Sequence, residues 1–397
     1  MLLFVLGRQP EIGFAELTAV LGGHVKLIAP EIAVFDDESA WSDKGDSDKE
    51  LARRQFARLG SVVKIAEVLD EIPDLSRPNL TKIASTKFNG IDGKITLGIS
   101  CYDKKMTAHD ALKIGLELKN ILGKKNSVRL IPNSEKALNS AAVFHNKLDG
   151  DNLKKTELIF ARRGDGRILA ARTIFVQDIN SYTFRDRGRP KRDARVGMLP
   201  PKLAQTMINL ATGGKTTGQL LDPFCGTGVV LQEAALIGFD VYGTDLEPRM
   251  IDYSEQNLEW LKQTHHVNFK QKLAAVDATD QIWDKPLDFV VTETYLGRAY
   301  SAEPTEDNLH ENMTNCDLIL TKFLKNLVGQ VTPETGICLA VPCWFVRNRL
   351  LRLNLTKNLA SFGYEQIFYS GLKTPLIYHR EDQIVGRELL VLRKKSV

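Results

Sequence analysis

Short apolar runs alternate with segments of helical spacing along the first 178 residues. Short or alternating apolar runs predict strands, whereas apolar residues three and four positions apart predict helices. The predicted strands span residues 2–6, 25–27, 32–35, 62–67, 94–99, 128–131, 158–162 and 168–176. The predicted helices span residues 10–21, 78–86 and 110–122. We therefore predict an N-terminal αβ domain at residues 1–60 and a second αβ domain at 61–178, with a polar surface loop at 36–50.

The pattern changes after residue 178. The stretch from Arg185 to Arg195 carries six cations and too few apolar residues to form a core, so residues 179–196 are predicted to be a linker or a phosphate-facing arm. Two prolines then open a helix at 202–211, with proline in its tolerated first-turn position. Further predicted strands lie at 220–222, 239–244, 273–276, 289–292, 336–341, 365–372 and 383–393. This order predicts an α/β fold for residues 179–397, a doubly wound Rossmann-like sheet with an antiparallel end.

The run LLDPFCGTG, residues 220–228, is the most informative segment of the chain. A strand ends in Asp222, a tight turn follows with Gly226 and Gly228, and a helix is predicted over 229–236. The next two strands end in Asp245 and Asp277, and a doubly wound sheet reaches a ribose diol at such an acid. A single strand-end aspartate would be ordinary in an α/β protein, but three successive ones predict a nucleoside-shaped pocket.

The spacing of the glycines narrows the choice of nucleoside. The third glycine of G-x-G-x-x-G is absent, and no Gly-Lys-Ser/Thr follows, which argues against a nicotinamide site and against a P-loop. The form DPFCGTG resembles motif I of class I S-adenosylmethionine-dependent methyltransferases. That resemblance implies S-adenosylmethionine as the cofactor, with its methionine end on Asp222 and the glycine backbone, its ribose on Asp245 and its adenine on Asp277. The full set of implied cofactor-binding residues is Asp222, Phe224, Gly226, Gly228, Asp245, Leu246, Asp277 and Ala278.

A fourth strand points Glu293, Thr294 and Tyr295 toward the same crevice. Methyltransferases that act on exocyclic base amines carry Asp/Asn-Pro-Pro-Tyr/Phe at this place. Acceptors there draw on the N–H bonds of the amine, and an aromatic ring stacks on the flipped-out base. Here Glu293 stands in place of the shorter acid, both prolines are absent, and Leu296 occupies the usual aromatic position. We predict Glu293, Thr294 and Tyr295 as the catalytic residues, against the alternative of an ordinary strand-end turn.

Composition sets the remaining bounds. A chain of 397 residues with 43% hydrophobic and 26% charged residues indicates two or three globular domains. No apolar stretch approaches membrane-spanning length, and the apolar start at residues 1–6 lacks the basic flank of a signal peptide, so we expect a first buried strand there. Five cysteines without C-x-x-C spacing favour reduced thiols in a cytoplasmic protein and no metal site.

Charge is distributed unevenly. Between Cys101 and Arg195 there are 21 Lys and Arg against 11 Asp and Glu, a local charge of +10 in a chain of net charge +4. Such asymmetry is what a region facing nucleic acid shows, because phosphate neutralisation supplies most sequence-independent affinity. On charge alone, a solvated basic face remains the alternative.

The whole chain resembles the THUMP-containing tRNA guanine-10 N2-methyltransferase family. The matching segments, besides motif I and the basic middle region, are FVLGRQPEI (4–12), RP (189–190), GMLPPKLAQ (197–205), YHR (378–380) and VGRE (385–388). The resemblance implies that residues 61–178 are a THUMP-like domain that grips tRNA by A-form shape and phosphates. Arg187, Arg189 and Lys202 are the candidate phosphate contacts. tRNA is thus the expected partner. The resemblance leaves open whether a small activating subunit is also needed.

The predicted reaction is methyl transfer from S-adenosylmethionine to N2 of a guanine in tRNA, at position 10 by resemblance. One rival is another exocyclic-amine methyltransferase of RNA or DNA, which the altered fourth motif keeps open. A second rival, of a different class, is a tRNA-binding protein whose methylase domain has lost its chemistry. Transfer of label from the cofactor to tRNA, with and without Glu293→Ala, separates these alternatives.

Overall fold

The computed structural model describes residues 1–36, 56–193, 198–300, 302–372 and 375–396. These residues form two compact units. Unit 1 comprises Met1–Phe14 and Leu21–Ser181, and unit 2 comprises Ala15–Val20 and Tyr182–Val397.

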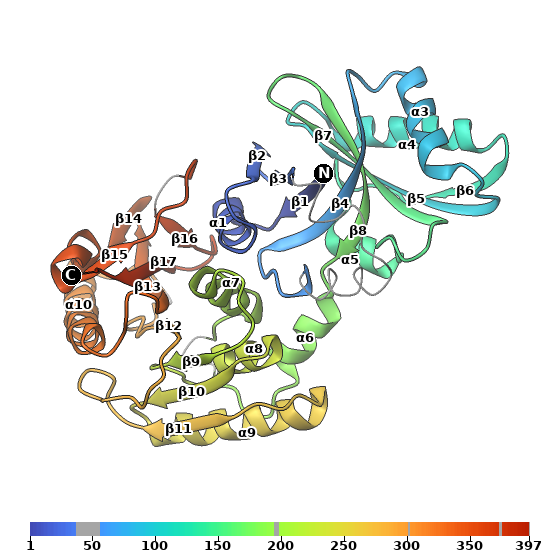
Figure 1. Cartoon of the computed structure of the whole chain (residues 1–397). Helices are drawn as coiled ribbons and strands as arrows, with labels where there is room; N and C mark the ends of the chain where they lie inside the picture. Colours follow the sequence, from blue (N-terminus) through green and yellow to red (C-terminus); the bar gives the residue numbers. More distant parts are fainter. Residues whose placement is uncertain (37–55, 194–197, 301, 373–374, 397) are drawn as a thin grey trace. The chain divides into compact units, whose positions relative to one another are not determined.

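Unit 1 is built on one eight-stranded sheet with the order β2-β3-β1-β4-β8-β7-β5-β6 (Figure 1). Strand β5 runs parallel to β6 and β7, and the other neighbours are antiparallel. The strands are β1 (Leu2–Leu6), β2 (Val25–Ala29), β3 (Ile32–Phe35), β4 (Val62–Ile72), β5 (Gly93–Tyr102), β6 (Asn126–Leu130), β7 (Lys155–Arg162) and β8 (Ile168–Val176). The helices are α1 (Pro10–Leu21), which continues into unit 2, α3 (Arg77–Phe88), α4 (Ala108–Leu122) and the short α5 (Ser140–His145).

Each strand and long helix predicted for this region is present. Leu118 and Ile114 of α4 pack with Ile83 of α3 onto apolar side chains of the sheet, as their spacing predicts. Strands β1 to β3 share their sheet with β4 to β8, so the division into domains at residue 60 stays a prediction. The predicted loop at 36–50 lies outside the described residues apart from Asp36.

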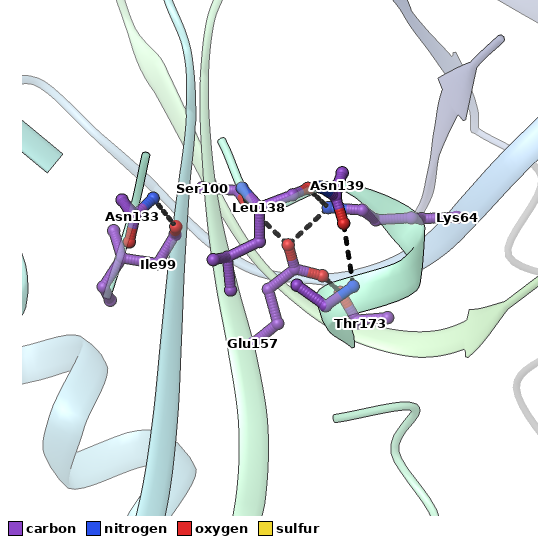
Figure 2. Close-up of polar contacts among 9 residues, drawn as sticks. Lys64, Ile99, Ser100, Asn133, Leu138, Asn139, Glu157 and Thr173 are labelled. Atoms are coloured by element: carbon purple, nitrogen blue, oxygen red, sulfur yellow. Dashed lines mark hydrogen bonds and ion pairs between the residues drawn. The ribbon is translucent and has the colours of Figure 1, made fainter. Parts of the chain in front are cut away.

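The core of unit 1 contains a buried ion pair, drawn in Figure 2. Lys64 of β4 donates to Glu157 of β7 at 2.5 Å and to the Leu138 carbonyl at 2.6 Å. The hydroxyls of Ser100 and Thr173 donate to the two oxygens of the same carboxylate. The lysine and glutamate side chains are 1% and 0% exposed. Each charge therefore has a partner, which is the condition under which a buried ion pair is tolerated.

Unit 2 contains a nine-stranded sheet with the order β11-β10-β9-β12-β13-β17-β15, to which β14 and β16 are added beside β13 and β17. The first five strands in this order are parallel, and β17 and β15 form the antiparallel end. The strands are β9 (Gln219–Asp222), β10 (Asp240–Asp245), β11 (Gln271–Ala275), β12 (Phe289–Glu293), β13 (Gly336–Val346), β14 (Arg349–Arg352), β15 (Tyr364–Gln366), β16 (Leu376–Tyr378) and β17 (Val385–Lys394). The predicted doubly wound sheet with an antiparallel end is confirmed.

Helices cover both faces of this sheet (Figure 1). Helix α10 (Glu306–Val328) buries Leu320 and Phe323 against Val290 and Leu339, which point to one face. Helices α7 (Pro201–Thr212) and α8 (Val229–Ile237) pack together, with α7 against β12 and β13 and α8 against β10. Helix α9 (Pro248–His265) packs against β10 and β11. None of the helices in the described part of the chain is long and apolar enough to cross a membrane.

Two predictions for residues beyond 178 need correction. The predicted linker contains helix α6 (Ile179–Arg187), and Arg185 of that helix is buried in an ion pair with Glu233, at 2.7 Å. The sequence pattern fails here because a long-range partner compensates the charge. The predicted strand at 365–372 is a strand over Tyr364–Gln366, whereas β14 and β16 were not predicted.

Candidate active site

A cavity of about 940 Å³ opens at the carboxyl ends of β9, β10 and β12 in unit 2. The position agrees with the general rule that ligands of open α/β sheets bind beyond the carboxyl ends of the strands. Ten of the eleven predicted cofactor and catalytic residues line it, and Gly228 does not. The ten are Asp222, Phe224, Gly226, Asp245, Leu246, Asp277, Ala278, Glu293, Thr294 and Tyr295.

The turn after β9 requires glycine at two places. Gly226 has φ of +51° and Gly228 has φ of +80°, both in the left-handed region that side chains disfavour. A Cβ on Gly228 would lie 2.8 Å from the Ser254 hydroxyl, so helix α9 packs directly on the turn. A Cβ on Gly226 would meet nothing within 4 Å, and this residue lines the cavity. Gly226 thus leaves room for a ligand, while Gly228 allows close packing behind it.

Asp222 lines the cavity and has 2% of its surface exposed. Its Oδ1 accepts a hydrogen bond from the Thr292 hydroxyl at 2.6 Å and one from the Phe224 amide at 3.2 Å. Burial is the largest influence on this carboxyl and raises its pKa to about 8, although both hydrogen bonds lower it. A cation placed beside Asp222 would favour its ionised form.

Asp245 and Asp277 hold their loops by accepting backbone hydrogen bonds. Asp245 accepts from the Gly226 amide at 2.9 Å and from the Glu247 amide at 3.0 Å. Burial raises its pKa above the ordinary value for aspartate. Asp277 is exposed and accepts from the Thr279 amide at 2.8 Å. Each carboxylate keeps lone pairs for a ligand, because an ionised carboxylate offers about four acceptor sites.

Glu293 ends β12 and forms an ion pair with Arg387 of β17. The two side chains are 14% and 9% exposed, and both residues line the cavity. Burial raises the pKa of Glu293, and the guanidinium opposes that rise. The Thr294 hydroxyl is directed to the Ala340 carbonyl, at 3.2 Å, so it anchors the loop. Tyr295 is 45% exposed, which leaves its ring available for stacking.

The loop after Tyr295 is fixed by Asn312 of α10. Its side-chain oxygen accepts from the Arg298 amide at 3.0 Å, and its amide donates to the Tyr300 hydroxyl at 3.0 Å. Gly297 lies against the same side chain with φ of +79°. These hydrogen bonds hold one wall of the cavity beside Glu293, and Leu318 and Ile384 also line the cavity.

The three candidate phosphate contacts lie outside the cavity lining. Arg187 is exposed at the end of α6. Lys202 is half-buried, with its ammonium 5.0 Å from the centre of the Tyr182 ring. Arg189 is 3% exposed, and its Nη2 lies 3.1 Å from the Met198 sulfur. Burial of the guanidinium makes Arg189 less accessible than Arg187, and its role as a phosphate contact stays a prediction.

Several residues of the site were missed by sequence reasoning. Arg387 is one of them, and a charged pair inside the apolar run of β17 was the signal that could have revealed it, because a buried charge needs a partner. Thr292 gave no signal, since its role depends on the neighbouring strand. Met198 and Leu199 were not missed: they line the cavity and belong to the segment at 197–205, which the family resemblance implies to pack beside the cofactor. No group of His, Cys, Asp or Glu in the described ranges is arranged to hold a metal ion.

The strand order, the antiparallel β17 and the acids at the ends of β9, β10 and β12 define a class I methyltransferase fold, which implies use of S-adenosylmethionine. A solved structure, TrmN from Thermus thermophilus, is similar over 99% of both chains, with a TM-score of 0.53 and 15% identity. Residues 189–316 match the UPF0020 family, described as an RMKL-like methyltransferase domain.

Sequence relatives narrow this class to one family. A probable tRNA (guanine(10)-N2)-dimethyltransferase of Methanothermococcus thermolithotrophicus is 32% identical over 28% of this chain and 70% of that protein. The chain belongs to the tRNA (guanine(10)-N2)-dimethyltransferase family. The relative from Methanothermobacter thermautotrophicus is 35% identical over 147 residues, which are 37% of this chain and 39% of that relative. The chain thus matches less than half of the length of that protein.

Proposed function

We propose that this chain transfers methyl groups from S-adenosylmethionine to the exocyclic N2 of guanine 10 in tRNA. The observation that carries the proposal is the placement of Asp222, Asp245 and Glu293 around one cavity in a chain of this family. The first two acids suit a nucleoside with a cationic end, and the third suits an amine acceptor.

The residues of the cavity fit the cofactor. Asp222 would face the ammonium group of the methionine end, and Asp245 would accept from the ribose hydroxyls. The open space beside Gly226 admits a ligand close to the backbone. Asp277 would accept from the adenine amino group, while Phe224, Leu246 and Ala278 offer apolar surface around it. Gly228 would act indirectly, by letting α9 support the turn.

The acceptor half of the cavity suits an aromatic amine. When bound, S-adenosylmethionine supplies an electrophilic methyl group on a sulfonium. The lone pair of a base amine is delocalised into the ring, so a hydrogen-bond acceptor on its N–H bonds increases its nucleophilicity. Glu293 would supply that acceptor and Tyr295 a stacking face, while Thr294 holds the loop that carries them. The N2 lone pair forms the new C–N bond, the C–S bond breaks, and an N2 proton leaves to Glu293 or water.

We place tRNA binding mainly in unit 1, with residues 61–178 as a THUMP-like domain beside the N-terminal αβ domain at 1–60. Of the +10 between Cys101 and Arg195, residues 101–178 carry +6 (15 Lys and Arg against 9 Asp and Glu), which supports this assignment. Arg187 remains a candidate phosphate contact because it is exposed. Lys202 also remains a candidate, although it is half-buried and its ammonium lies near the Tyr182 ring. For an enzyme that modifies tRNA and has reduced cysteines, we expect a cytoplasmic location.

The test is incubation of the purified chain with labelled S-adenosylmethionine and bulk tRNA, followed by nucleoside analysis. We expect label in N2-methylated guanosine, and a loss of about 100-fold or more in Glu293→Ala. A different labelled nucleoside would refute the substrate. Cofactor binding without transfer to any nucleic acid would favour the binding protein, unless a small activating subunit restores transfer. Transfer by the chain alone would show that no such subunit is required.

A further inference from the structure

Glu293 and Arg387 come from strands on either side of β13. Glu293 pairs with Ala340 in the parallel ladder, and Arg387 pairs with Pro342 in the antiparallel one. Val290 and Leu390 belong to the core on the α10 face, so alternation along each strand places Glu293 and Arg387 together on the opposite face. The small Ala340 between them leaves room for the arginine to reach across β13. The ion pair is therefore built into the register of three strands.

The neighbouring residue provides a comparison within the same strand. Glu388 points to the other face, where it is fully buried and paired with Arg352 of β14, at 2.8 Å. Strand β17 thus carries two ion pairs back to back. The Arg387 pair lines the cavity, and the Arg352 pair is absent from its lining.

The surroundings of Glu293 explain why it needs a cation. Asp222 at the end of β9 and Asp245 at the end of β10 also line the cavity, so several carboxyl groups share it. Strand β13 contributes the apolar Ala340 at this level, and the adjoining loops contribute Tyr295, Arg298 and Asp382 to the lining. Arg387 donates from its Nε to the Glu293 carboxylate. Burial alone would favour the neutral acid.

We propose that Arg387 is a positioning residue for methyl transfer, which keeps the Glu293 carboxylate ionised and directed at the acceptor amine. The proposal rests on the function proposed above. A carboxylate that is protonated loses an acceptor oxygen, and a glutamate arm that is free to rotate loses its direction. Arg387 prevents both, and so replaces the rigidity that the missing prolines of the fourth motif would have given.

The same geometry explains why residue 293 is a glutamate and not the shorter aspartate. An aspartate in place of Glu293 would end about 1.5 Å short of Arg387, because it has one methylene fewer. We therefore expect Glu293→Asp to lose most of its activity, although it restores the acid that is usual at this position. Arg387 and Glu293 would then be a matched pair.

The pH dependence of kcat provides the main test. In Arg387→Met the acid limb of the profile should move to higher pH, with about a 10- to 100-fold loss near pH 7 that is partly recovered near pH 9. Arg387→Lys should restore part of the activity. Arg352→Met removes the other ion pair of β17, and should lower stability without moving the acid limb. A loss in Arg387→Met that is independent of pH would overturn the proposal, as would full activity.

A measurement without turnover supports the same test. Because burial holds the Glu293 pKa above its unfolded value, the folded state binds more protons, and stability falls as pH rises. Loss of the guanidinium should raise the folded-state pKa further and so extend that fall to higher pH. Equal slopes in wild type and Arg387→Met would count against the electrostatic role.

The outcomes separate the two proposals. Absence of transfer by wild type to any tRNA, or full activity of Glu293→Ala, would contradict the proposed function itself. An inactive Glu293→Ala together with a fully active Glu293→Asp and an unshifted Arg387→Met profile would contradict the role of Arg387 alone.

Discussion

At the scale of single residues, Asp222 of unit 2 is a buried carboxyl whose protonation should respond to the proposed cofactor. Its carboxyl is buried and accepts two hydrogen bonds, yet its pKa is raised to about 8. Near neutral pH it is therefore mostly protonated before a cation arrives. Binding of a positively charged cofactor favours the ionised form, so binding should release a proton.

We predict that the affinity for S-adenosylhomocysteine, which keeps the ammonium group, increases as pH rises toward 8 and then levels off. The limiting slope is about tenfold per pH unit, because binding would be coupled to the release of one proton. Calorimetric titration in buffers of different ionisation enthalpy measures both the affinity and the released proton. Asp222→Asn should bind more weakly and without this pH dependence. A flat profile in wild type would contradict the prediction.

The buried pair of unit 1 leads to a second prediction at this scale. Lys64 and Glu157 share one core with Ser100 and Thr173 (Figure 2). Glu157→Leu leaves the lysine without its ionic partner and should lower the free energy of unfolding by about 3–5 kcal/mol. Lys64→Met/Glu157→Leu should cost less than the sum of the single changes, because no charge remains buried.

Chemical denaturation of each variant measures these values. Lys82→Met serves as the control, because it removes an ion pair with Asp70 whose lysine is 64% exposed. That change should stay within about 1 kcal/mol. Strict additivity of the two core substitutions would show that the ion pair carries no coupling.

At the scale of elements, the turn after β9 is held by helix α9. The Ser254 hydroxyl donates to the Gly226 carbonyl at 2.8 Å, and the Asn257 amide donates to the Thr227 carbonyl at 2.8 Å. The same asparagine exchanges hydrogen bonds of 2.9 Å with the backbone of Lys191. Helix α9 therefore joins the turn to the segment that precedes α7.

We predict opposite defects for alanine at the two glycines of this turn. Both substitutions add about 1–2 kcal/mol of backbone strain at positive φ. Gly228→Ala also collides with Ser254, so its larger effect should be on stability. Gly226→Ala meets open space on the cavity side, so its larger effect should be on cofactor affinity. Denaturation midpoints and S-adenosylhomocysteine titrations distinguish the two, and parallel effects on both quantities would contradict the assignment.

The elements also show how far sequence reasoning reaches. Periodicity located β1, α1, β3 and β8 at their observed bounds, because each has a clear apolar face or run and a clear end. It failed for α6, where the buried Arg185 depends on Glu233, 48 residues away. In the candidate site, too, local features could be predicted and long-range contacts could not. Strand-end acids were predictable from local pattern, whereas Arg387 depends on strand register across the sheet.

At the scale of the whole molecule, charge is separated along the chain. The segment from Cys101 to Arg195 has a charge of +10, which leaves about −6 for the remainder of a chain with net +4. Several of these cations, including Lys124 and Lys125 after α4, are exposed. A substrate that carries many phosphates should therefore sense the middle of the chain more than the rest.

We predict that the KM for tRNA rises about tenfold or more between about 50 and 200 mM salt. The Lys and Arg side chains must then compete with more concentrated salt cations for the phosphates of the tRNA. The affinity for S-adenosylhomocysteine should change much less, since its site lies in the cavity of unit 2. Lys124→Glu/Lys125→Glu should raise the KM for tRNA and reduce its salt dependence, with kcat nearly unchanged. The matched control is Lys322→Glu/Lys325→Glu, which makes the same charge change at exposed positions of α10. Equal effects of the two double variants would mean that net charge, and not the basic middle region, governs tRNA binding.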